Sequence, residues 1–429
     1  MELAIGLLLL IVFLAVVAAI VKGQSPVVML IILAIAWAAL AGININDIQS
    51  KVLQGGGTQY ASAVIIIVFG AWFAQILVQT GIAESVIRSA VELAGDRPIV
   101  TAMVVTLVTA LLFTSMYGVG AAIAIGVIAI PIMLSQGIPP AVAAPTFTMG
   151  IGAGTFINLV QFGTMKPLFP GIAYEAPWLN VWVVGMIVYI LAAWLMANFH
   201  LRLRGVRHSA TVDLAAAEPI RKKRTPYYTY VVPLVPVFMV IVLKWEIIPT
   251  FMLSIVIALL STYKDRSLQG HINLFNKTFY DAFPDIATIA ALWTICGMII
   301  VAGMTPQVSG ALQPVFGPIL PHTPLQAAIF FAVLGGIGNI YRGPLEVIGT
   351  GAALLAIIRS ANLLPIPLLY ALWFPGTVMS GSVDPTNSWT LWTIGYTKVT
   401  HGQFLKVALP FGMLMVAVST FAAYFMLGH

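Results

Sequence analysis

The stretch GNIYRGPLE, residues 338–346, lies between two strongly apolar segments, AAIFFAVL at 327–334 and AALLAII at 352–358. An arginine and a carboxylate inside hydrocarbon are costly unless they are paired or bind a ligand, and the Gly-Pro pair stops a helix. Arg342 and Glu346 therefore indicate a functional break inside a membrane-embedded element.

The composition of the chain is that of a membrane protein. Of its 429 residues, 60% are hydrophobic and 8% are charged, whereas about 25% of an average soluble domain is charged. Apolar windows of about 20 residues, the length that crosses a bilayer core, recur along the whole chain. The first window, Leu3–Ile20, is interpreted as a retained span because it lacks a basic leader and a cleavage motif, and Lys22 follows it. The predicted spans are residues 1–22, 27–43, 60–79, 98–115, 119–135, 141–163, 178–201, 227–244, 247–263, 284–303, 323–340, 344–359, 365–392 and 407–427.

The segment 204–225 separates the chain into two halves and carries a basic cluster at 221–224. Basic loops remain on the cytoplasmic side, so we expect a cytoplasmic linker between an N-terminal half, 1–203, and a C-terminal half, 226–429. The net charge of +6 is explained by this topology and by contact with membrane lipid. The sequence lacks the exposed basic and aromatic layout of a nucleic-acid binder, and we expect a multi-pass protein of a bacterial-type inner membrane.

The two halves carry the same two interruptions in the same order. TSMYGVGAAIAIGVIAIPIMLSQGIPP at 114–140 parallels GNIYRGPLEVIGTGAALLAIIRSANLLPIP at 338–367. A second broken span follows each, MGIGAGTFINLVQFG at 149–163 and MSGSVDPTNSWTLW at 379–392. Paired discontinuous segments at corresponding positions are typical of the binding site of a secondary transporter.

This pattern predicts an all-α polytopic membrane protein built from two inverted repeats. Each repeat would contain about five transmembrane helices, one re-entrant hairpin and one unwound helix, and an odd number of spans inverts the second repeat. The predicted inward hairpin covers 98–135 and the outward hairpin 323–359; the predicted unwound helices cover 141–163 and 365–392. If the hairpin arms instead span the bilayer fully, the number of spans in each repeat is still odd, so that alternative stays open.

The quoted segments resemble those of the ion transporter superfamily, which includes citrate, C4-dicarboxylate and gluconate carriers and sodium–proton antiporters. LLFTSMYGVGAAIAIGVIAIPIML (111–134) and GGIGNIYRGPLEVIGTGAALL (335–355) look like its two hairpins. FTMGIGAGTFINLVQFGTMKP (147–167) and TVMSGSVDPTNSWTLW (377–392) look like its two unwound helices. The resemblance implies a homodimer that works by an elevator-like motion. Divalent-anion–sodium symporters of the superfamily carry Ser-Asn-Thr at both hairpin tips, where this chain has Ser-Met-Tyr at 115–117 and Asn-Ile-Tyr at 339–341.

The breaks themselves suggest ligands. Unwinding frees backbone carbonyls that suit a small cation and backbone amides that suit a carboxylate, and neither can face lipid. An isolated Ser or Thr in a span is more often a helix–helix hydrogen bond, but these residues are clustered. The candidate substrate-binding residues are Arg342, Tyr117, Tyr341, Asn339, Gly343, Thr155, Asn158, Thr386 and Asn387. The candidate residues for cation or proton coupling are Thr114, Ser115, Gly152, Ser380, Ser382, Asp384 and Glu346.

Arg342 has two open interpretations. Its planar guanidinium suits bidentate recognition of a substrate carboxylate. Alternatively, Arg342 pairs with Glu346 and holds the hairpin tip together. The two roles can also alternate, with Glu346 taking up a proton when Arg342 turns to the substrate, because a carboxylate withdrawn from water is easily protonated.

We therefore expect a secondary active transporter that moves a small organic anion, a carboxylate, coupled to Na⁺ or H⁺. The alternatives are a Na⁺/H⁺ antiporter of the same superfamily and the large membrane subunit of a tripartite carrier that depends on a binding protein. No nucleophile elbow, phosphate loop or metal-ligand spacing occurs in the sequence, so an enzyme is not expected. We expect no cofactor apart from Na⁺ as a coupling ion, and the expected partners are the anionic substrate, membrane lipid and a second copy of the chain.

Overall fold

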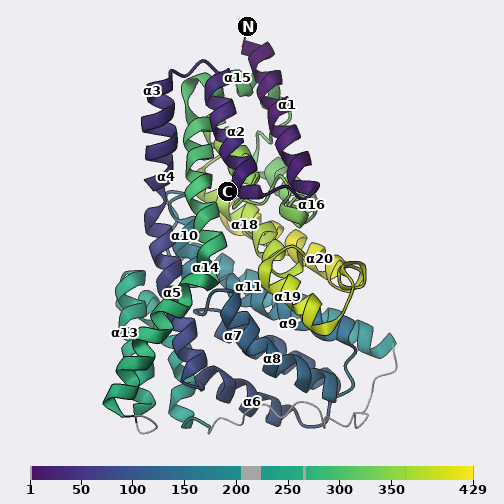
Figure 1. Cartoon of the computed structure of the whole chain (residues 1–429). Helices are drawn as coiled ribbons and strands as arrows, with labels where there is room; N and C mark the ends of the chain where they lie inside the picture. Colours follow the sequence, from purple (N-terminus) through teal and green to yellow (C-terminus); the bar gives the residue numbers. More distant parts are fainter. Residues whose placement is uncertain (1, 204–223, 264–266, 363, 429) are drawn as a thin grey trace.

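The computed structural model describes residues 2–203, 224–263, 267–362 and 364–428, and within these ranges the chain is helical, without strands (Figure 1). The all-α fold predicted from the sequence is confirmed. Six helical stretches of the described residues are long and apolar enough to cross a bilayer: Glu2–Ile20, Ile45–Gln79, Trp178–Leu203, Leu268–Met304, Ile366–Thr397 and His401–Leu427.

The described parts of the two halves share one order of elements. Each has two helices, a long helical stretch, a short amphipathic helix, a helical hairpin, a broken helix and a long last helix. The first half contains α1 (Glu2–Val21), α2 (Pro26–Leu40), α3 (Ile45–Asp47), the π-helix η1 (Ile48–Gly55), α4 (Gly56–Gln59), α5 (Ala61–Gln79), α6 (Ile82–Ala94), α7 (Pro98–Leu112), α8 (Val119–Ser135), α9 (Pro140–Thr155), α10 (Leu159–Met165) and α11 (Trp178–Leu203). The second half contains the 3₁₀ helix η2 (Tyr227–Leu234), α12 (Val235–Leu243), α13 (Ile247–Ser261), α14 (Leu268–Met304), α15 (Pro306–Phe316), α16 (Pro324–Ile337), the 3₁₀ turn η4 (Ile340–Arg342), α17 (Gly351–Ala361), α18 (Ile366–Val383), α19 (Ser388–Thr397) and α20 (His401–Leu427). This shared order agrees with a repeat, while the inversion of the second repeat stays a prediction.

Two helical stretches begin well before the spans predicted at 60–79 and 284–303. The first begins at Ile45, where the Asn44 side chain accepts a hydrogen bond from the Asp47 amide at 2.9 Å, and α14 begins after Ser267, which caps it in the same way. Hydropathy windows do not detect these turns because their side chains are polar. Residues 204–223 of the predicted linker, 204–225, lie outside the described residues. Arg224, which is described, pairs with Glu92 on α6.

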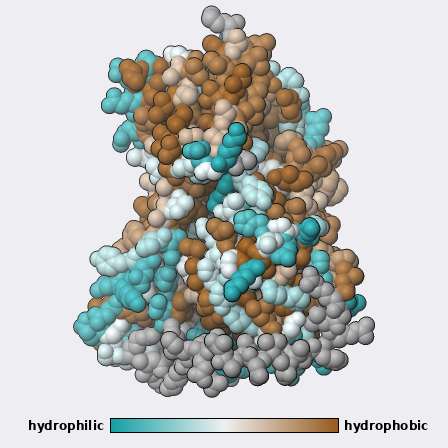
Figure 2. All heavy atoms as spheres, turned by 45° about the vertical axis from the view of Figure 1, so that its right-hand side comes forward, coloured by the Kyte–Doolittle hydropathy of each residue, from teal (hydrophilic) through white to brown (hydrophobic). Residues whose placement is uncertain are grey.

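The helices pack as two groups. One group joins α1, α2 and α12–α14 to the stretch α3–α5, and the other joins α7, α9 and α11 to α16, α18 and α20. Helices α8, α10 and α17 continue the two hairpins and the first broken helix of the second group along the chain, and they contact the first group: α17 contacts α14, and α8 and α10 contact α5. Large apolar side chains remain exposed along the outer helices, including Ile11 at 61% and Leu260 at 65%, as is typical of a surface that contacts the membrane. Figure 2 shows the upper end of the molecule covered largely by apolar residues, and polar residues at the narrower middle and over the lower left of this face.

Candidate functional site

The tip of the first hairpin is held by one buried side chain. Asn158, between α9 and α10, donates from Nδ2 to the carbonyls of Phe113 at 2.7 Å and Met116 at 2.9 Å. Its Oδ1 accepts from the Gln161 amide at 2.9 Å and caps α10. The tip then turns at Gly118, whose φ of 100° lies in a region that a side chain disfavours. The break between α9 and α10 therefore fixes the shape of the hairpin tip between α7 and α8.

The tip of the second hairpin has a strained backbone. Tyr341 and Arg342 have φ values of 56° and 57°, a left-handed conformation that costs a residue with a side chain roughly 1–2 kcal/mol. Hydrogen bonds hold it there: the Arg342 amide donates to Asp384 Oδ2 at 3.3 Å, and the Thr350 hydroxyl donates to the Gly343 carbonyl at 2.9 Å. Strain that surrounding contacts maintain in this way is concentrated at binding and switching sites.

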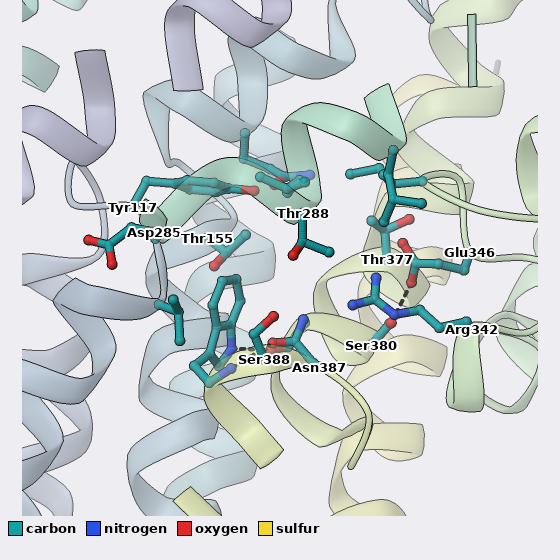
Figure 3. Close-up of a pocket in the computed structure, with 18 of the residues that line it drawn as sticks. Tyr117, Thr155, Asp285, Thr288, Arg342, Glu346, Thr377, Ser380, Asn387 and Ser388 are labelled. Carbon is teal, nitrogen blue, oxygen red and sulfur yellow. Dashed lines mark hydrogen bonds between the residues drawn. The ribbon is translucent and has the colours of Figure 1, made fainter. Parts of the chain in front are cut away.

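Both tips and both broken helices border a cavity of about 250 Å³, and α14 closes it from the other helix group (Figure 3). The wall is amphipathic, with hydroxyl and amide groups beside the rings of Tyr117 and Trp389, whose centroids lie 6.3 Å apart. The cavity is lined by Tyr117, Gly118, Val119, Thr155, Gln161, Pro284, Asp285, Thr288, Ile289, Leu292, Arg342, Glu346, Ile348, Thr377, Ser380, Gly381, Asn387, Ser388 and Trp389. A small cavity with a few convergent polar groups is the usual form of a site for a small molecule.

The guanidinium group of Arg342 points into this cavity, toward the space between Thr288 and Asn387 (Figure 3). Glu346 is buried and accepts a hydrogen bond from the Ser380 hydroxyl. Among the described residues, no carboxylate lies within 4.0 Å of the guanidinium, so Arg342 and Glu346 do not form an ion pair in this conformation. The five N–H donors of Arg342 are therefore available to a ligand.

Asp285 of α14 lies at the other end of the cavity, and its carboxylate points away from Arg342 (Figure 3). It accepts a hydrogen bond from Gln75 Nε2 of α5 at 2.5 Å. Its oxygens lie against the backbone of Gly120 in the first turn of α8, where an added Cβ would collide with them. One carboxylate thus connects α5 and α14 of the first helix group to the hairpin of the second group.

The structure brings some of the sixteen predicted residues together. Those that border the cavity are Tyr117, Thr155, Arg342, Glu346, Ser380 and Asn387. Tyr341 and Thr386 border an adjoining cavity. The remaining predicted residues border neither of these cavities: Thr114, Ser115, Gly152, Asn158, Asn339, Gly343, Ser382 and Asp384.

Several of those remaining residues make local contacts. The Ser115 hydroxyl donates to the Pro233 carbonyl at 2.5 Å, and the Thr114 hydroxyl donates to the Leu111 carbonyl at 2.8 Å. Asp384 accepts from both the amide and the hydroxyl of Thr386 at 2.8 Å. These groups shape the tips and breaks from behind the cavity wall.

The sequence interpretation did not include five polar residues of the wall. They are Gln161, Asp285, Thr288, Thr377 and Ser388. The segments already predicted to be broken contain Gln161, Thr377 and Ser388. Asp285 is an acid at the start of a predicted span, and an acid in a span is itself a signal of function. Nothing in the pattern pointed to Thr288, which reaches the cavity through the packing of α14.

The fold is similar to that of a solved structure, the YdaH transporter of Alcanivorax borkumensis, which is described as having an unusual topology. The alignment covers 94% of this chain and 98% of that one, with a TM-score of 0.65 and 13% sequence identity. At that identity the similarity establishes the fold, that of a polytopic helical membrane transporter, and membership of the ion transporter superfamily stays a prediction. No protein-family model matches the chain, and the comparison with curated proteins found no relative.

Proposed function

We propose that the chain is a secondary active transporter for a small organic anion that bears a carboxylate, coupled to Na⁺ or H⁺. The observation that carries the proposal is the guanidinium of Arg342, which faces a cavity between the two helix groups and has no carboxylate of the described residues within 4.0 Å. A partly buried cation without an ion pair is costly in a membrane protein, and a bound anion would reduce that cost. The setting we propose is a bacterial-type inner membrane.

In this proposal the cargo carboxylate binds Arg342 through two parallel N–H donors. Asn387, Ser388 and Thr288 offer further hydrogen bonds around it, and the rings of Tyr117 and Trp389 cover its apolar part. The buried carboxylate of Glu346, with the Ser380 hydroxyl beside it, is the proposed place for the coupling proton or cation. None of these steps needs a further cofactor.

The division of the helices into two groups supports an elevator-like motion. The cavity lies where α14 of one group faces both tips and both breaks of the other, so sliding of the groups would carry Arg342 and the other residues of the tips and breaks past α14. A dimer that anchors the first group in the membrane would make that sliding effective, and we propose a homodimer for this reason.

The proposal is tested by uptake of a panel of labelled carboxylates into proteoliposomes with an imposed Na⁺ or H⁺ gradient. For a carboxylate that the wild type carries, Arg342→Lys is expected to lower the apparent affinity at least tenfold, because an ammonium cannot supply two parallel donors. The apparent affinity is measured from the thermal shift as a function of substrate concentration. Arg359→Lys is the matched control, since Arg359 lies in the last turn of α17, outside the cavity, and it should keep the wild-type affinity.

The double variant Arg342→Gln with Glu346→Gln provides the result that could contradict the proposal. It removes the charges of Arg342 and Glu346 together, so neither is left without the other, and the Arg342 amide can still donate to Asp384; the variant should therefore fold. Substrate stabilisation that persists in this variant would remove Arg342 from the site, and with it the reason for assigning an anionic cargo.

A Na⁺/H⁺ antiporter is the second candidate, and the two carboxylates on the cavity wall, Asp285 and Glu346, favour it. An antiporter would exchange Na⁺ for H⁺ across proteoliposomes without any organic anion. The transporter that we propose would show neither ion flux until its anion is added.

A further inference from the structure

A second, larger cavity adjoins the candidate site. Its volume is about 450 Å³, within the range of roughly 300–1,000 Å³ that is usual for ligand pockets. It lies between the turn that joins α1 to α2 and the second hairpin, and α14 forms a third side. Gly23, Gln24 and Val27 border it from the turn and the start of α2, and Tyr341 and Thr350 border it from the hairpin.

The two cavities share a wall. Arg342, Thr288, Leu292, Ile348 and Ser388 border both of them. A molecule that moves from the second cavity to the first would therefore pass Arg342 without leaving its reach. Tyr341 and Arg342 both have the left-handed backbone described above, so the guanidinium is carried by a strained segment that small backbone rotations would relax.

The charge of the two walls differs. Arg342 is the one ionisable side chain with a formal charge among the residues that border the second cavity, which gives that wall a charge of +1. The first cavity adds the carboxylates of Asp285 and Glu346 to the same arginine, which gives +1 − 2 = −1 when both are ionised. Asp384 borders neither cavity, and its oxygens accept from Thr386 and from the Arg342 amide.

We propose that the second cavity is a waiting site for the anionic cargo, in which a carboxylate binds Arg342 before it enters the first cavity. The inference rests on the proposed function and extends it to the order of events. An anion binds the positive wall without a companion ion, whereas the wall of the first cavity becomes favourable only after a proton or a cation offsets its carboxylates. The coupling ion is therefore required when the carboxylate moves from the second cavity into the first, and not when it first binds in the second cavity.

Cysteine labelling at the α1–α2 turn tests the waiting site directly. The one native cysteine, Cys296, is buried, so a Cys296→Ala background leaves a single engineered thiol. Gln24→Cys places that thiol on the wall of the second cavity, and Ser25→Cys places it on the next, exposed residue, which does not border the cavity. The probes are an anionic and a cationic methanethiosulfonate reagent of similar size, applied to the purified protein.

The ratio of anionic to cationic labelling rates should be at least threefold higher at Gln24→Cys than at Ser25→Cys, because Arg342 attracts the anionic reagent. Adding Arg342→Gln should reduce the Gln24→Cys ratio to the Ser25→Cys value. A carboxylate that the protein transports should slow labelling of Gln24→Cys, and should do so in Na⁺-free buffer at each pH tested, while labelling of Ser25→Cys should not change.

Equal ratios at the two positions, or a Gln24→Cys ratio that does not depend on Arg342, would overturn the waiting site. So would protection by the carboxylate that appears only when the coupling ion is present. These outcomes are separable from a failure of the proposed function, in which the wild-type protein carries no carboxylate from the panel at all.

Discussion

Two asparagines occupy matching places in the two broken helices but have different surroundings. Asn158 is buried and satisfies two carbonyls of the neighbouring hairpin as well as capping α10. Asn387 caps α19 only through a long hydrogen bond from the Trp389 amide at 3.3 Å, and its side chain borders the cavity. The sequence pattern predicted equivalent roles for the two asparagines, but their contacts in the structure differ.

Asn158→Ala should therefore reduce stability, by about 3 kcal/mol or more, because it removes a helix cap and leaves two buried carbonyls unpaired. Asn387→Ala should cost about 1 kcal/mol or less and should weaken cargo binding instead. Thermal unfolding in detergent, measured with and without a transported carboxylate, separates the two effects. Equal losses of melting temperature in both variants would contradict the different roles inferred from the contacts.

At the scale of elements, the two broken helices cross at Gly152 of α9. An added Cβ there would lie 2.5 Å from Tyr189 Cε1 and 2.6 Å from Ser382 Oγ, which no ordinary contact allows. The Tyr189 and Ser382 hydroxyls are themselves hydrogen-bonded, so α9, α11 and α18 meet at one point without spare volume. Gly152 therefore acts through close packing.

Gly152→Ala should destabilise the protein by about 1–3 kcal/mol, the usual cost of overpacking a buried contact. Gly381→Ala is the matched control on α18, because its Cβ would meet Trp389 at 3.7 Å, an ordinary distance. Melting temperatures of the two variants provide the comparison. A wild-type melting temperature for Gly152→Ala would show that the crossing is looser than these distances indicate.

The breaks between consecutive helices have local signals in the sequence, whereas the re-entrant course of the hairpins stays a prediction. A Gly, Pro or Asn inside an apolar run changes the backbone within a few residues, so α7–α8, α9–α10 and α18–α19 could be placed from letters alone. The contribution of α14 to the cavity could not be predicted, because Thr288 and Asp285 reach it through long-range packing. The amphipathic helices α6 and α15 were not predicted as helices for another reason, since hydropathy windows detect only segments that are apolar on all sides.

At the scale of the whole molecule, the orientation of the repeats is the main untested prediction. The positive-inside rule places the segment before α7 in the cytoplasm and the turn before α16 outside. Asp96 and His322 are exposed in those two places, so each can carry a reporter cysteine in the Cys296→Ala background.

In intact bacterial cells, an impermeant maleimide should label His322→Cys, because that turn would face the outside. Asp96→Cys should be labelled only after the membrane is permeabilised. Permeabilised cells, in which both positions should react, control for expression and folding. Labelling of Asp96→Cys alone in intact cells would invert the topology, and labelling of both would exclude opposite orientations of the two hairpins.

The contact of Asp285 with the Gly120 backbone at the start of α8 also has a kinetic consequence. If the two helix groups slide past each other, this contact must break in every cycle, whereas the hydrogen bond from Gln75, which joins α5 to α14 within the first group, can remain. A hydrogen bond to a charged group is worth about 1.5–3 kcal/mol. Because each 1.36 kcal/mol changes a rate tenfold, one carboxylate can slow the turnover number by roughly one to two orders of magnitude. The turnover number of the carrier would then be limited by the contact between Asp285 and α8, at the other end of the cavity from Arg342, which selects the cargo. Selectivity and turnover could therefore be altered independently.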